Sequence, residues 1–178
     1  QGGTLQATLK VDGVVMEATG AYHLPILSYL KEKGFKRYEV SNFAVKGFES
    51  KHNLNYWRRG EYIGVGVSAS SFMDNRRFTN TFKIDEYMNA VIYNKSPEIS
   101  SDEITGDDAE FEFIMLGLRT ADGISVKEFN QTFNVDFDEK YKEALNKKSK
   151  FLERNGDNLR IKDQYLYVQN DIILQFMK

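Results

Sequence analysis

The residues best suited to chemistry lie in one short segment, His-Asn-Leu-Asn-Tyr-Trp, at residues 52–57. It holds one of the two histidines of the chain and its only tryptophan. A neutral imidazole is the commonest metal ligand among side chains, and a tyrosine oxygen is another donor that can reach a metal. If the segment is helical, His52 and Tyr56 share a face because they are four residues apart. The alternative is a loop that His52 and Asn53 tie down by hydrogen bonds, with Trp57 packed in the core, and the residues alone leave both open.

A run of small residues from Gly64 to Ser71 follows this segment. Gly64 and Gly66 allow the backbone to approach a ligand closely, and the serines add donors at the end of a predicted strand. The run lacks the lysine of a P-loop and the full spacing of a dinucleotide fingerprint. A tight packing point between a strand and a helix is the alternative. The candidate ligand contacts are Gly64, Gly66, Val67, Ser68, Ala69 and Ser70.

Composition limits the possible classes of protein. A chain of 178 residues, 41% hydrophobic and 28% charged, fits one substantial globular domain or two small ones. The absence of cysteine excludes disulfides, thiolate metal ligands and an iron–sulfur cluster bound by this chain. A net charge of -2 and a pI near 5.8 argue against a nucleic-acid-binding surface. No apolar run is long enough to span a membrane and no signal peptide is visible, so we expect a cytoplasmic protein.

The elements that position these residues are expected to form two domains, 1–97 and 98–178, divided at Pro97. In the first domain, residues 1–20 show no clear pattern. Glu39, beside two basic residues, is expected to be a paired, solvated carboxylate. The predicted elements are a helix over 21–33 that carries His23, strands over 36–43 and 62–67, and a helix over 82–94 with Ile84, Tyr87, Met88 and Val91 on one face.

The second domain is predicted to be mostly helical. Three helices and a short β-hairpin are the composition of a winged-helix module. The expected core consists of Phe111, Ile114, Leu118, Phe129, Leu145, Leu152 and Phe176. The expected elements are a helix opened by Ser100-x-x-Glu103, a helix opened by Ser125-x-x-Glu128, a helix over about 138–155, a hairpin that pairs 159–161 with 165–168, and a final helix.

Several motifs in order along the chain resemble the carboxyl-terminal half of the oxygen-independent coproporphyrinogen III oxidase-like radical S-adenosylmethionine (SAM) proteins. The resemblance covers roughly residues 22–178. The motifs are Tyr-Glu-Val-Ser-Asn-Phe-Ala at 38–44, Glu-Ser-x-His-Asn-Leu-x-Tyr-Trp at 49–57, Gly-x-Gly-Val-Ser-Ala-x-Ser at 64–71, Glu-Phe-Ile-Met-Leu-Gly-Leu-Arg at 112–119, and Asp-Gly-Ile at 122–124.

The resemblance implies a fold and a function. The fold would be α/β followed by α: the remnant of a partial (β/α) radical SAM barrel, then a winged-helix-like carboxyl-terminal domain. The His-Asn-x-x-Tyr-Trp form resembles the haem chaperone branch, which implies haem or porphyrin contacts at His52, Tyr56 and Trp57. It also implies delivery of haem to respiratory haem proteins, with peripheral contact to membrane-bound clients. The run at 64–70 would border the SAM pocket.

One departure from the family is clear. Members carry a cysteine triplet that holds a [4Fe–4S] cluster, and this chain has none. We therefore expect a fragment of the longer protein, inactive alone, whose parent would bind SAM and the cluster. Two other functions stay open: a fragment of the oxidase itself, which decarboxylates porphyrinogen propionates, and a non-enzymatic winged-helix interaction or DNA-binding module. Acidic residues interleave with the lysines of the third helix, which favours a solvated face over nucleic-acid binding.

Overall fold

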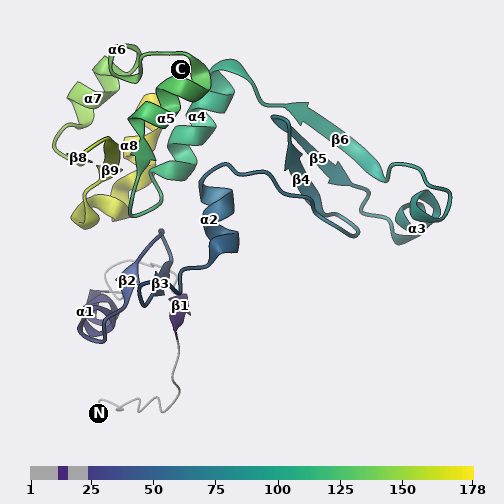
Figure 1. Ribbon diagram of the computed structural model, residues 1–178, viewed down its shortest axis with the longest axis horizontal. Coiled ribbons are helices and arrows are strands. Elements are labelled where there is room, and N and C mark those ends of the chain that lie inside the picture. The colour runs from purple at the N-terminus through teal and green to yellow at the C-terminus, as the bar shows by residue number, and fades with distance from the viewer. Residues whose placement is uncertain (1–11, 16–23) are drawn as a thin grey trace. The chain divides into compact units, whose positions relative to one another are not determined.

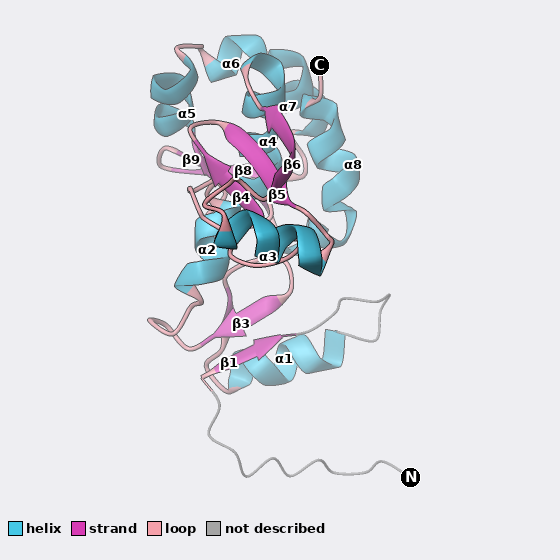
Figure 2. Ribbon diagram, turned by 90° about the vertical axis from the view of Figure 1, so that its right-hand side faces the viewer, coloured by secondary structure: helices cyan, strands magenta, loops and turns pink. Residues whose placement is uncertain are grey.

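The computed structural model describes residues 12–15 and 24–178 of the chain. The chain divides into two compact units, Gln1–Lys51 and His52–Lys178. Both units combine short strands with helices (Figure 2), so the expected mixture of helix and sheet is confirmed. Every strand pair in the described residues is antiparallel. The predicted boundary at residue 97 stays a prediction.

The first unit contains a three-stranded antiparallel sheet and one described helix. Gly34 follows the helix with a φ of +84°, the backbone conformation that a glycine helix cap supplies. The prediction of one strand over residues 36–43 is wrong, because the chain turns back between β2 and β3. His23 lies outside the described residues, as does most of 1–20. The elements are β1 (Gly13–Val15), α1 (Leu24–Glu32), β2 (Lys36–Arg37) and β3 (Asn42–Ala44), in the sheet order β1-β3-β2.

A second antiparallel sheet, in the order β4-β5-β6, follows helix α2 (Lys51–Trp57). Strands β4 (Ser70–Met73) and β5 (Arg76–Asn80) are joined by Asp74 and Asn75, both with positive φ, as a two-residue hairpin turn requires. Strand β6 (Glu98–Glu103) pairs with β5. The strand predicted over 62–67 is wrong: only Tyr62 pairs, through an isolated bridge to Phe72.

Helix α3 (Ile84–Ile92) lies between β5 and β6 in the chain, at the end of this sheet (Figure 1). The helical period of its apolar residues is as predicted. Ile84, Met88 and Val91 are nevertheless exposed, at 67%, 50% and 55% of their surface. The period therefore identified the helix correctly, although this apolar face is not covered by the described part of the chain.

The rest of the second unit contains helices with a third three-stranded sheet, in the order β7-β9-β8 (Figure 1). None of the helices in the described ranges is both long enough and apolar enough to cross a membrane. The elements are α4 (Gly106–Gly117), β7 (Ile124–Ser125), α5 (Val126–Phe133), α6 (Phe137–Lys140), α7 (Lys142–Lys148), β8 (Leu152–Asn155), β9 (Asn158–Ile161), the 3-10 helix η2 (Asp163–Val168), α8 (Gln169–Ile173) and the 3-10 turn η3 (Leu174–Phe176).

Three local predictions for this region are wrong. The Ser100-x-x-Glu103 motif does not cap a helix, because these residues pair with β5 as strand β6. The helix predicted over 138–155 is broken into α6 and α7, and its last residues form strand β8. Strand β9 pairs with β8 and β7, and 165–168 lie in the 3-10 helix η2. The Ser125 cap is confirmed, since its hydroxyl accepts from the Glu128 N–H at 3.0 Å.

The core of this part of the unit agrees with the sequence pattern. Ile114, Leu118, Phe129 and Phe176 are fully buried, and Leu152 is nearly so. The other two predicted members, Phe111 and Leu145, are partly buried against the same cluster. Burial of large aromatic and aliphatic side chains at about 1.5–3 kcal/mol each accounts for much of the stability.

Candidate functional site

The α2 helix places His52 and Tyr56 together, as their spacing predicts. Both side chains are exposed, and their rings lie edge to face with centroids 4.8 Å apart. Tyr62, in the loop that follows α2, continues the contact with its ring centroid 4.6 Å from that of Tyr56. The result is a solvent-accessible imidazole packed against Tyr56, whose ring is in turn packed against Tyr62, and this arrangement is able to present a nitrogen ligand to a metal.

Trp57 lies on the opposite side of α2. At about 100° per residue, Trp57 is turned about 140° from His52, and Leu54 and Arg58 flank the tryptophan. Leu54, Trp57 and Arg58 line a cavity of about 410 Å³ together with residues of α4, the 120–125 loop, α5 and β9. We call this cavity the Trp57 pocket. His52 and Tyr56 do not line it, so the His-Asn-x-x-Tyr-Trp segment presents two separate faces.

The glycine-rich run forms a closed loop whose backbone donors are mostly used inside the protein. The Gly64 N–H donates to the Ser71 hydroxyl at 3.0 Å, and the Gly66 N–H donates to the Tyr87 hydroxyl at 3.0 Å. The Ser68 N–H donates to the Thr81 carbonyl. Val67 is half-buried. The Ala69 N–H is 3.4 Å from the Gly66 carbonyl, and the Ser70 hydroxyl pairs with that of Thr79.

This loop geometry explains the glycines without a ligand. A Cβ on Gly64 would lie 2.2 Å from the backbone oxygen of Ser70, and Gly66 has a φ of +113°. Close backbone packing and a left-handed conformation are both reasons for glycine. That this run contacts SAM stays a prediction for a longer parent protein.

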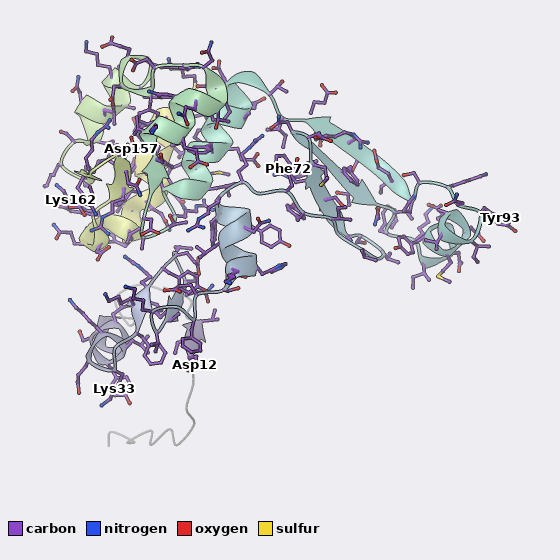
Figure 3. All side chains as sticks on the ribbon, viewed as in Figure 1. Asp12, Lys33, Phe72, Tyr93, Asp157 and Lys162 are labelled. Atoms are coloured by element: carbon purple, nitrogen blue, oxygen red, sulfur yellow. The ribbon has the colours of Figure 1, made fainter. Side chains whose placement is uncertain are left out.

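Sequence inspection missed a charged cluster around Glu112 of α4. Arg59 Nε donates to one carboxylate oxygen of Glu112 at 2.9 Å, and Arg77 of β5 donates to the other at 2.5 Å. The Arg59 and Glu112 side chains are only 8% and 11% exposed. Both guanidinium groups also lie over the ring of Phe72, the β4 residue labelled in Figure 3. No local motif could have indicated a contact between residues 53 positions apart.

The electrostatic consequence is clearest for Arg77. Burial lowers the pKa of Arg77, but the hydrogen bond and the charge of Glu112 outweigh burial and raise the pKa above its ordinary value. Arg59 adds hydrogen bonds to the Asn75 side chain at 2.8 Å and to the Ile104 carbonyl at 3.3 Å. The cluster therefore fastens α4 to the sheet and to the end of α2, rather than forming a reactive site.

A second charged cluster lies between α4 and α6. Lys140 Nζ is 2.6 Å from Asp107 and 2.8 Å from Glu110, and Glu110 also accepts from the Tyr141 hydroxyl at 3.0 Å. Hydrogen bonds with Asp107 and Glu110 raise the pKa of Lys140. Burial, together with the bond to Glu110, raises the pKa of the Tyr141 hydroxyl. These shifts favour the charged ammonium of Lys140 and the neutral hydroxyl of Tyr141.

Glu39 is not the solvated carboxylate expected from its basic neighbours. It is 1% exposed, and its Oε1 has no hydrogen-bond partner among the residues that the structure describes. The basic residues before it in the sequence suggested a solvated carboxylate, but Glu39 lies in the connection between β2 and β3, where the turn decides which side chains are buried.

An iron–sulfur cluster needs thiolate ligands from the protein. The chain has no cysteine to supply thiolate ligands. Within the described ranges, no group of three or more histidine, aspartate or glutamate side chains is placed to hold a metal ion. The residues present therefore do not fit a resident [4Fe–4S] cluster.

Comparison with known proteins defines the class. Residues 104–168 match the model of the HemN C-terminal domain. The described fold resembles that of an Escherichia coli protein whose structure is described as "Coproporphyrinogen III oxidase (HemN) from Escherichia coli is a Radical SAM enzyme", with a TM-score of 0.66 at 14% identity. That likeness covers 87% of this chain and 40% of the solved chain, and it concerns the fold alone. The chain is thus similar to the carboxyl-terminal part of a HemN-type radical SAM protein.

Individual relatives indicate one branch of these proteins. The chain is 30% identical over 154 residues to the heme chaperone HemW of Lactococcus lactis, and 32% identical over 130 residues to that of Bacillus subtilis. These alignments cover 85% and 67% of this chain but only 40% and 34% of the relatives, so the chain spans less than half of their length. The resemblance expected from the sequence, to the HemW-like branch of these proteins, is confirmed.

Proposed function

We propose that the chain is the carboxyl-terminal part of a haem chaperone of the HemW type and that it contributes a haem contact. One observation carries the proposal: His52 presents an exposed imidazole on α2, supported edge to face by Tyr56 at 4.8 Å. The likeness to proteins named heme chaperone HemW supports haem as the ligand.

The geometry of this face suits a large flat ligand. Haem needs an accessible nitrogen or oxygen donor for its iron and an apolar surface for its ring. His52 supplies the nitrogen. Tyr56 and the half-buried Tyr62 supply adjacent aromatic surface, and the exposure of His52 and Tyr56 leaves room for a disc to approach from solvent. Trp57 was predicted to complete the wall, but α2 turns it toward the Trp57 pocket, so we assign the haem contact to His52 and Tyr56.

Radical chemistry is not part of the proposal for this chain. The oxidase alternative rests on HemN as a structural neighbour, which supports the fold alone. The side chains of this chain do not fit an iron–sulfur cluster, since it has no cysteine. Bound in a longer parent, such a cluster and SAM would supply radical chemistry.

We also propose a winged-helix module for the carboxyl-terminal part of the chain and a partial barrel ancestry for the part before it. Helices α4, α5 and α7, the β8–β9 hairpin and strand β7 beside β9 occur in the order of a winged-helix module, and this supports that description of the HemN-like domain. A partial barrel ancestry for residues 1–97 rests on the resemblance. The DNA-binding alternative is disfavoured, since Lys140, Lys148 and Arg154 each pair with a carboxylate. Respiratory haem proteins as recipients, and a cytoplasmic location, remain predictions.

The proposal is tested by titrating haemin into the chain and following the Soret band. The variant His52→Ala should bind haemin at least about tenfold more weakly, because losing one iron–ligand bond costs no less than a charge-assisted hydrogen bond, about 1.5–3 kcal/mol. The variant Tyr56→Phe keeps the ring contacts and should change affinity little if the imidazole is the ligand.

His23→Ala is the matched control, because it removes the only other imidazole. It should leave both the affinity and the spectrum unchanged. Equal effects of His52→Ala and His23→Ala would contradict the assignment.

A further inference from the structure

The Trp57 pocket is a second site, on the face of α2 opposite to the proposed haem contact. Its volume of about 410 Å³ falls in the range of about 300–1,000 Å³ typical of ligand sites. Two aromatic residues, Trp57 and Phe113, form apolar walls, and Leu54 and Ile124 complete the apolar lining. The walls are therefore suited to a flat group.

Most neutral polar groups around the pocket are already satisfied. The Thr120 hydroxyl donates to the Gly117 carbonyl at 2.8 Å and accepts from the Gly123 N–H at 3.1 Å. The Ser125 hydroxyl donates to Asp157, labelled in Figure 3, at 2.5 Å, and caps α5. These hydroxyl groups lock the 120–125 loop and the start of α5 in place, so they stabilise the pocket rather than select its ligand.

Three charged side chains at the pocket are available to bind a ligand. Within the described part of the chain, the Asp122 and Glu128 carboxylates and the Arg58 guanidinium have no hydrogen bond or ion pair. The pocket thus presents two free negative charges and one free positive charge beside an indole ring. A bound cation is attracted by two carboxylates and by the face of the indole ring, and is repelled by one guanidinium. A bound anion is attracted by one guanidinium and repelled by the two carboxylates and the ring face.

We propose that the Trp57 pocket binds a guanidinium group, as carried by an arginine side chain. A guanidinium is planar, so it can stack on Trp57, and its fork of donors matches the carboxylates of Asp122 and Glu128. An ammonium group carries the same charge but is not planar, so it cannot stack on the indole ring in this way. The inference does not depend on haem binding, because His52 and Tyr56 do not line this pocket.

Trp57 is the only tryptophan of the chain, so its fluorescence reports on this pocket alone. The protein is titrated with N-acetyl-arginine amide, with free arginine and with the neutral isostere N-acetyl-citrulline amide. Saturable quenching or a shift of the emission is expected for the arginine compounds and not for citrulline. Tighter binding of the amide than of free arginine would indicate that the guanidinium group belongs to an arginine within a polypeptide. Tighter binding of free arginine would indicate that it belongs to a small molecule.

Charge variants make the test specific. Asp122→Asn and Glu128→Gln should each weaken binding about two- to fivefold, the range for exposed charge pairs. Arg58→Gln should strengthen it by a similar factor because it removes the repelling charge. Glu143→Gln is the control, since Glu143 is an exposed acid on α7 away from the pocket. In the described part of the chain, the side chains of Arg58, Asp122 and Glu128 have no hydrogen bond or ion pair to lose, so the fold is expected to persist, and circular dichroism verifies that.

Three results would overturn the proposal. One is equal binding of the arginine and citrulline amides. Another is weaker binding in Arg58→Gln, which would indicate an anionic ligand. The third is no saturable change, either in fluorescence or in the indole N–H resonance of Trp57, at millimolar arginine amide.

Discussion

Removing the Glu112 carboxylate should destabilise the second unit more than removing any exposed carboxylate of α4. Glu112 receives hydrogen bonds from Arg59 and Arg77, and the Arg59–Glu112 pair is about nine-tenths buried on both sides. The variant Glu112→Ala leaves Arg59 buried without that counter-charge. Loss of one partner of a buried ion pair costs about 3–5 kcal/mol.

Two features of the structure set the expected magnitude. Arg59 keeps its bonds to Asn75 and to the Ile104 carbonyl, which places the loss near the lower limit, at about 3 kcal/mol. Arg77 is 38% exposed, so solvent screens its pair with Glu112 and that pair adds only about 0–1 kcal/mol. A loss of about 3 kcal/mol is large against the 5–15 kcal/mol typical of a domain.

Urea unfolding, followed by circular dichroism and by Trp57 fluorescence, measures this loss. Asp108→Ala is the matched control, because Asp108 is an exposed acid on the same helix. It should change the free energy of unfolding by less than about 0.5 kcal/mol. If Glu112→Ala and Asp108→Ala cost the same, the carboxylate does not hold α4 to the sheet. A double-mutant cycle with Arg59→Met then measures the coupling directly.

Four further predictions follow from local geometry. Gly64→Ala should cost about 1–3 kcal/mol in urea unfolding, because the added Cβ meets the Ser70 carbonyl at 2.2 Å and the backbone must shift; a neutral substitution would show that the loop adapts freely. Val91→Lys should change stability by less than about 0.5 kcal/mol, since this α3 residue is 55% exposed, and a larger loss would mean that the face is covered in solution. Hydrogen bonding to Lys140 lowers the pKa of Asp107, so the folded state releases the Asp107 proton more readily than the unfolded state. The resulting contribution to the free energy of unfolding is present above pH 3.8 and is lost as the pH falls through the lower pKa of the folded state. Lys140→Gln should flatten this acid dependence of the unfolding free energy. Residues 98–178 expressed alone should show a cooperative thermal transition, and a gradual one would count against the predicted boundary.

The sequence by itself determined the features that depend on neighbours a few residues away. The Ser125 cap and the buried stripe of Ile114 and Leu118 both follow from helical spacing and local hydrogen bonding. The shared face of His52 and Tyr56 has the same origin. The ordered motifs also sufficed to indicate the relationship to HemN-type proteins, which the comparisons confirmed.

Tertiary structure decided everything that depends on a distant partner. Residues 98–103 carry a plausible helix cap, yet pairing with β5 makes them a strand, because cross-strand hydrogen bonds outweigh a weak local preference. The α3 period predicts a helix but not what covers its apolar face. The separation of Trp57 from His52, and the pocket that Trp57 shares with α4 and α5, arise only when the chain returns through residues 113–128. Contacts across such sequence distances leave no spacing that a sequence pattern can show.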